Sequence, residues 1–164
     1  MQCYTHTLPG GASLVGYLRE ETTEMPAFNT RPAMLILPGG GYAYCSSREA
    51  DPVAMQFLQA GYNVFILYYT CRGQESQPAL RWQPLIDAAG AILHIRKNAV
   101  QFHIDPAKVA VCGFSAGGQE NPRFAAAARR IERALYYEYS LGDEFYPQFC
   151  QNIEILQPLL DRML

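Results

Sequence analysis

Lysine is nearly absent from this chain, which has only two lysines and a formal net charge of −2. We therefore expect no nucleic-acid partner, because the chain has no basic patch. Its apolar runs are only strand-sized, too short to span a membrane. The five cysteines are scattered and never have C-x-x-C spacing, which argues against a zinc or redox motif. Dispersed thiols and a start without signal-peptide character favour a cytoplasmic protein.

Short apolar runs alternate with helical periodicity over the first two thirds of the chain. Residues 33–37, 62–69 and 109–112 are predicted to be buried parallel strands, because each is a continuous apolar run. Helices are predicted between them, at about 46–60 and 85–101. This order predicts one α/β domain with a partial sheet of three parallel strands and helices on its faces.

The remaining segments follow other patterns. Residues 2–7 and 13–18 flank a Pro-Gly-Gly turn and are expected to form an antiparallel hairpin at the sheet edge. Residues 104–108 are expected to form a turn before the third parallel strand. No later apolar strand is predicted. Residues 119–164 are predicted to form a helical hairpin whose alanine- and arginine-rich first helix covers 123–139.

A nucleophile motif follows the third parallel strand. Gly113-Phe114-Ser115-Ala116-Gly117 fits G-x-S-x-G, in which a sharp strand-to-helix turn lifts a serine hydroxyl above the end of a sheet. Glycine flanks the serine on both sides, where a side chain would collide with neighbouring backbone. A serine in this place is predicted to be a nucleophile elbow rather than an ordinary turn residue.

A glycine run, Gly39-Gly40-Gly41, follows the first parallel strand. Acyl transfer builds negative charge on a carbonyl oxygen, and each backbone N–H aimed at that charge typically contributes about 3 kcal/mol. The expected donors of this oxyanion hole are Gly40 or Gly41, with Ala116 directly after the serine. A plain tight turn is the alternative. The run does not fit G-x-G-x-x-G, so no nucleotide cofactor is expected.

The sequence has no histidine after Ser115. A serine nucleophile needs a base to take its proton, and in α/β-hydrolases the histidine comes last in chain order. His6, His94 and His103 all precede the serine, and we expect each to be a surface or packing residue. The sequence therefore predicts a hydrolase nucleophile without its base.

Five segments together carry a family resemblance. They are residues 38–42, 47–49, 60–65, 99–106 and 111–118. In this order and spacing they resemble the bacterial α/β-hydrolases of the acetyl-xylan and feruloyl esterase-like group, which are carboxylesterases. The resemblance implies Ser115 as the nucleophile, with Gly40, Gly41 and Ala116 as oxyanion donors.

The resemblance covers about residues 1–118, which we take as the N-terminal part of such a domain. In the family, further strands bearing an acid and the catalytic histidine follow the nucleophile. Residues 119–164 do not resemble that part, and we interpret them as a helical segment produced by truncation, frameshift or fusion. The strand at 109–112 is then expected to leave an open sheet edge. A homodimer through that edge or through the helical tail is predicted.

Two functions remain open. The first is a serine carboxylesterase-type hydrolase that forms an acyl-enzyme from small or carbohydrate esters, impaired because no histidine follows Ser115. The alternative is a non-catalytic α/β-hydrolase remnant that serves as a binding or assembly scaffold. Neither requires a metal or cofactor, and neither involves a membrane.

Overall fold

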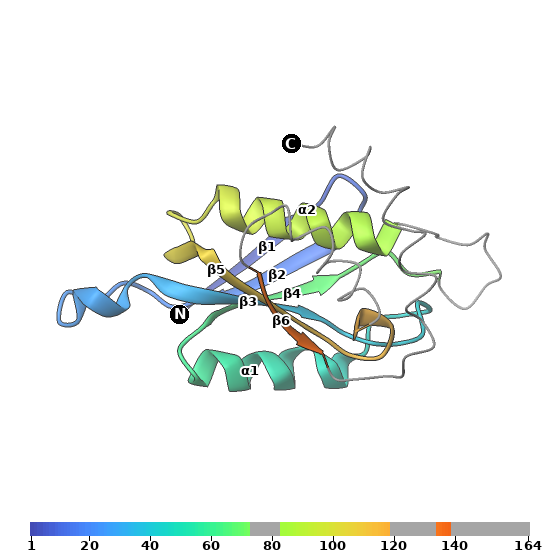
Figure 1. Cartoon of the computed structure of the whole chain (residues 1–164), viewed down its shortest axis with the longest axis horizontal. Coiled ribbons are helices and arrows are strands. Elements are labelled where there is room, and N and C mark those ends of the chain that lie inside the picture. The colour runs from blue at the N-terminus through green and yellow to red at the C-terminus, as the bar shows by residue number, and fades with distance from the viewer. Residues whose placement is uncertain (73–82, 119–133, 139–164) are drawn as a thin grey trace.

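A six-stranded sheet forms the centre of the molecule, as seen in the computed structural model (Figure 1). The structure describes residues 1–72, 83–118 and 134–138. The strands are β1 (Gln2–Thr7), β2 (Ser13–Leu18), β3 (Arg31–Leu37), β4 (Asn63–Tyr68), β5 (Ile104–Gly113) and β6 (Ala134–Glu138). Their spatial order is β1-β2-β4-β3-β5-β6. The last four in this order run parallel, whereas β1 and β2 form an antiparallel hairpin against β4.

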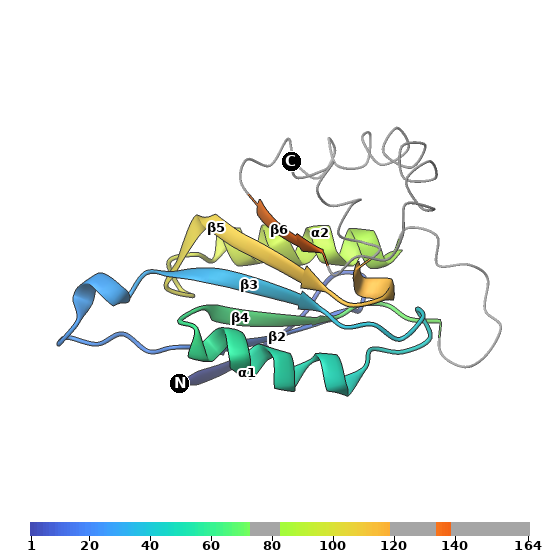
Figure 2. The ribbon, with the colours of Figure 1, turned by 60° about the horizontal axis from the view of Figure 1, so that its bottom comes forward.

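Two α-helices cover opposite faces of this sheet (Figures 1 and 2). They are α1 (Asp51–Gln59) and α2 (Gln83–Lys97), and the shorter 3₁₀ turns are η1 (Pro26–Phe28) and η2 (Ser47–Glu49). This arrangement confirms the predicted α/β fold class, because helices on both faces allow the parallel strands to be apolar throughout. Within the described ranges, no helix has the length and hydropathy of a membrane span.

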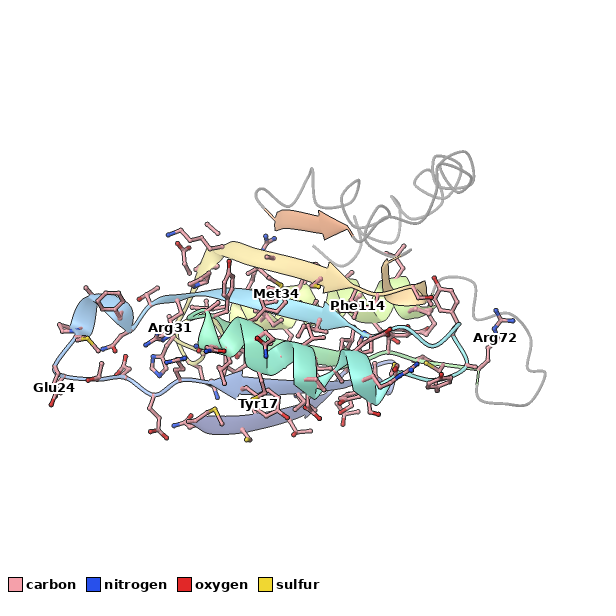
Figure 3. All side chains as sticks on the ribbon, turned by 90° about the horizontal axis from the view of Figure 1, so that it is seen from below. Tyr17, Glu24, Arg31, Met34, Arg72 and Phe114 are labelled. Carbon is pink, nitrogen blue, oxygen red and sulfur yellow. The ribbon has the colours of Figure 1, made fainter. Side chains whose placement is uncertain are left out.

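Alternating side chains of the central strands supply both halves of the core. Leu35 and Phe65, which are paired across β3 and β4, belong to the cluster on the α2 side. Their neighbours Met34 and Val64 belong to the cluster on the α1 side, and Figure 3 shows Met34 on β3, next to α1. All four are fully buried. Burying one such side chain contributes about 2 kcal/mol, so the two faces together hold the sheet rigid.

Strand β5 and helix α1 begin at other residues than the sequence predicts. The turn predicted at 104–108 is the beginning of β5, where the register with β3 shifts between Arg31 and Ala33. The side chain of Asp105 accepts a hydrogen bond from the Ala107 amide in this irregular stretch, which gives it a turn-like sequence. The first helix begins only at Asp51, because residues 47–49 form the 3₁₀ turn η2.

Strand β6 corrects the expectation for the tail. Residues 134–138 form a parallel strand along 109–113 of β5, so the helix predicted over 123–139 is wrong at this place. The open edge predicted at 109–112 is also wrong, since β6 covers it. The rest of the predicted helical hairpin lies outside the described residues, and the homodimer and the boundary after residue 118 stay predictions.

A buried asparagine ties the loops at the start of the parallel strands. Asn63 is fully buried, and its side-chain amide donates to the Phe102 carbonyl at 2.7 Å. Its side-chain oxygen accepts from the Arg19 amide at 2.9 Å. One side chain thus joins the segment before β5 to the end of the N-terminal hairpin.

We predict that Asn63→Ala lowers the free energy of unfolding by about 2 kcal/mol, because it leaves the Phe102 carbonyl buried without its partner. Urea denaturation measures the change. Val100→Ala is the control, since Val100 is 91% exposed and its truncation should alter stability by less than about 0.5 kcal/mol. Equal stability of the Asn63→Ala and Val100→Ala variants would contradict this role.

Candidate active site at the carboxyl ends of β3 and β5

The ends of two neighbouring parallel strands bring the predicted site residues together. Leu37, the last residue of β3, pairs with Gly113, the last residue of β5. One residue further, the Phe114 amide donates to the Leu37 carbonyl at 3.0 Å. The segment after β3 and the segment after β5 therefore leave the sheet side by side. Active sites of α/β folds form in this position.

Ser115 lies at the top of a strained turn. Its φ angle is +49°, in the left-handed region that a residue with a side chain rarely adopts. Ser115 is exposed, whereas Ala116 and Gly117 after it are buried and begin a helical turn. The Gly117 amide closes the turn by donating to the Phe114 carbonyl at 2.8 Å. Strain of this kind is concentrated at functional sites, and here it holds an exposed hydroxyl-bearing residue above the sheet.

Glycine is required where the two segments meet. A Cβ atom at Gly117 would lie 2.9 Å from the Pro38 carbonyl oxygen and closer still to that of Leu37. A Cβ atom at Gly39 would lie 2.7 Å from the Phe114 carbonyl oxygen and 3.0 Å from the Ser115 Cβ atom. Real Cβ atoms do not come this close. The absence of a side chain at Gly39 and Gly117 therefore lets the loop after β3 and the serine turn lie directly against each other.

The glycine run then folds back on itself. Gly40, Gly41 and Tyr42 all have positive φ angles, of +140°, +62° and +63°. The Gly40 carbonyl accepts from the Ala43 amide at 3.0 Å, and a Cβ atom at Gly40 would overlap the Tyr44 carbonyl. The structure therefore places Gly40 and Gly41 on a tight loop beside the serine turn.

Side chains that the sequence analysis did not single out hold this loop. The Glu49 carboxylate accepts from the Gly39 amide at 2.8 Å. The Tyr42 hydroxyl donates to the Ala116 carbonyl at 3.1 Å, and the Tyr69 hydroxyl donates to the Pro38 carbonyl at 2.6 Å. Tyr42 and Glu49 stood within two segments of the family resemblance, but no local pattern identifies Tyr69. The Gly39 N–H is therefore occupied by the Glu49 carboxylate. Gly40 and Gly41 carry the next amides along the loop.

The histidines lie elsewhere. The His103 carbonyl accepts from the Arg31 amide at 3.0 Å, and Figure 3 shows Arg31 at the opposite end of the sheet from Phe114. His6 of the outer strand β1 stacks on His94 of α2, with ring centroids 4.0 Å apart. Within the described ranges, no hydrogen bond joins a histidine to Ser115, and no group of three potential metal ligands is present.

His94 is held in a half-buried aromatic group. A hydrogen bond of 2.6 Å joins its Nε2 atom to the Tyr4 hydroxyl of β1. Burial lowers the pKa of His94, and the neighbouring His6 lowers it further through charge repulsion. The folded chain therefore favours a neutral ring at this position, which suits a packing role.

The family model described as BD-FAE matches residues 23–137, more than half of the chain. The chain therefore belongs to the BD-FAE family. This confirms the family resemblance, and the match extends through most of β6. The relatives and solved structures include carboxylesterases, which places the chain in a family of hydrolases.

Three similar proteins were also found. The chain is 47% identical to endo-1,4-beta-xylanase B of Butyrivibrio fibrisolvens over 53% of its length and 14% of the relative. It is 27% identical to carboxylesterase NlhH of Mycobacterium tuberculosis, over 80% of its length and 41% of the relative. The solved α/β hydrolase MGS-M1, from a deep-sea metagenome of the Medee basin, is 40% identical, with a TM-score of 0.66 over 75% of this chain and 51% of that one. The chain thus spans about half or less of each.

The two glycines Gly117 and Gly41 give a matched test of the site's packing. We predict that Gly117→Ala lowers the free energy of unfolding by more than about 3 kcal/mol, because the added methyl group overlaps β3 backbone. Gly41→Ala should cost only about 1 kcal/mol, from its positive φ angle, because a Cβ atom there meets nothing within 4 Å. Urea denaturation of both variants measures the difference. Similar losses in the two would contradict the close approach.

Acid should weaken the fold through His94. Since the pKa of His94 is lowered on folding, the folded state binds fewer protons, and stability rises with pH. This contribution is complete above the unfolded pKa of about 6.5 and is lost as the pH falls through the folded pKa. Denaturation midpoints from pH 8 down to 5 test it. We expect His94→Gln to flatten this slope, and an unchanged slope would assign the pH dependence to other groups.

Proposed function

We propose that the chain has the nucleophilic half of a serine carboxylesterase. The observation that carries this proposal is the conformation of Ser115, which is exposed, has a φ angle of +49° and lies two residues after the end of β5. A serine on such a turn presents its hydroxyl to a substrate outside the sheet. The hydroxyl oxygen attacks an ester carbonyl carbon, the alcohol leaves, and water then releases the acyl group from the serine.

The glycine loop is proposed to stabilise the oxyanion of that attack. Gly40, Gly41 and the amide of Ala116 are the donors we assign. The closeness of the loop to the serine turn supports this, because even a Cβ atom added at Gly39 would lie 3.0 Å from the Ser115 Cβ atom. The Glu49, Tyr42 and Tyr69 hydrogen bonds fix the loop beforehand. Such preorganisation is what makes amide donors effective.

Small esters and carbohydrate esters are the proposed substrates. NlhH is named a carboxylesterase, and the relative from Butyrivibrio is named a xylanase. Serine acyl transfer needs no metal or cofactor, so we assign none. We also propose a cytoplasmic location, because the five cysteines are odd in number and widely spaced in the sequence, and a homodimer as the assembly to be tested.

The absence of a histidine after Ser115 limits the activity we expect from these 164 residues. His103 bonds to the first residue of β3, at the far end of the sheet, and His6 and His94 pack on each other. We therefore propose that, for these 164 residues, water or a group on another chain accepts the proton. For this reason, a non-catalytic scaffold that retains the hydrolase fold stays as the second candidate function.

Hydrolysis of a short-chain aryl acetate separates the two candidates. We expect slow hydrolysis by the chain, reduced to background in Ser115→Ala, since part of a serine hydrolase's acceleration persists without its base. Ser47→Ala is the matched control, because Ser47 is exposed and lies outside the Ser115 turn. Equal rates for the chain and for Ser115→Ala would favour the scaffold.

Added imidazole refines this test. It can accept the serine proton in place of the absent histidine, so we expect it to increase the Ser115-dependent rate. Imidazole also cleaves aryl acetates by itself, and subtracting the Ser115→Ala rate at each concentration removes that contribution. A labelled organophosphonate that attaches to Ser115 would identify the nucleophile independently of turnover.

A further inference from the structure

Two cysteines from distant parts of the chain meet beside the glycine loop. Cys45 follows that loop after β3, and Cys71 follows the end of β4. Their sulfur atoms are 3.7 Å apart, although 26 positions separate them in sequence. Both residues are half-buried and pack against the core cluster on the α2 side. The thiols are therefore in direct contact and partly open to solvent.

The backbone on each side of Cys71 is anchored. The Thr70 amide donates to the buried Asp87 carboxylate at 2.8 Å, and the Arg72 amide donates to the Tyr42 carbonyl at 2.8 Å. The thiol itself donates to the Tyr69 carbonyl at 3.3 Å. The position of Cys71 is thus set by its neighbours rather than by the thiol contact.

Cys45 is anchored in the same way. The Ser46 amide donates to the Gly39 carbonyl at 2.8 Å, and the Tyr44 amide donates to the Gly40 carbonyl at 3.4 Å. Both bonds attach the segment to the glycine loop. The two sulfur atoms, 3.7 Å apart, are therefore carried by two anchored backbone segments. A disulfide needs sulfur atoms about 2.05 Å apart, so the two sulfur atoms must move toward each other for the bond to close.

We propose that Cys45 and Cys71 form a dithiol site that closes to a reversible disulfide by exchange with a small-molecule disulfide. The proposal stands on the geometry of the two thiols and does not depend on the proposed hydrolase function. Within the described ranges, no group of three potential metal ligands is gathered around the pair.

The exchange proceeds in two steps that balance. The Cys71 thiolate attacks one sulfur of oxidised glutathione, forms a mixed disulfide and releases one glutathione thiolate. The Cys45 thiol then loses its proton and attacks the Cys71 sulfur, which releases the second glutathione. Two protein thiols are oxidised, and one glutathione disulfide is reduced to two thiols.

The surroundings favour this order of attack. The hydrogen bond from Cys45 lowers the pKa of Cys71, whereas the same bond, together with burial, raises the pKa of Cys45. Cys112 is a poorer nucleophile, because burial raises its pKa to about 11. Cys3 is exposed on the outer strand β1. The pair is thus chemically distinct from the other described thiols.

Peptide mapping tests the proposal directly. Trypsin separates the two cysteines, because cleavage after Arg19, Arg48 and Arg72 gives peptides 20–48 and 49–72, each with one cysteine. The whole chain is incubated with oxidised glutathione, alkylated, digested and analysed by mass spectrometry. We expect the two peptides joined by a disulfide, with a mass lower by two hydrogens than the sum of the free peptides. Dithiothreitol should release both.

Two single-cysteine substitutions test the order of the two steps. Cys3→Ser should leave the cross-link unchanged, whereas Cys45→Ser should trap glutathione on Cys71, because the second thiol is absent. The proposal is overturned if Cys45 and Cys71 of the unaltered chain are both alkylated after incubation with oxidised glutathione, because alkylation marks thiols that stayed free. It is also overturned if glutathione stays attached to Cys71 to the same extent with and without Cys45, or if Cys3 enters the main cross-link.

Discussion

The parallel pairing of β3 with β5 is the constraint on which the candidate site depends. It aligns Leu37 with Gly113, so that two segments far apart in sequence leave the sheet at one point. The absence of a side chain at Gly117 then lets the helical turn press against the Leu37 carbonyl. Without this contact the serine turn and the glycine loop would be two unrelated loops. The core on both faces keeps the strands in this register.

Much of this arrangement was predictable from the sequence because it depends on short local patterns of residues. Continuous apolar runs identified β3, β4 and the second half of β5, and the small-residue motif located Ser115. Strand β6 was missed, since Ala-Leu-Tyr-Tyr-Glu follows an alanine- and arginine-rich stretch that favours helix. Its pairing with β5 is a tertiary interaction, and such interactions override weak local preferences.

The supports of the site were not predictable for a different reason. Glu49 reaches Gly39 across ten positions, and Tyr69 reaches Pro38 across 31. Neither bond has a sequence signature, because each depends on how the loops pack after the sheet has formed. The same holds for the two thiols, whose wide spacing suggested dispersed cysteines until the fold placed Cys45 against Cys71.

The left-handed backbone at Ser115 also has an evolutionary consequence. Glycine would relax this position by about 1–2 kcal/mol, so selection for folding alone would replace the serine. A side chain kept there lowers the stability of the fold. Stability and activity are often in conflict in this way. Lineages that no longer use the hydroxyl should drift toward glycine at this position.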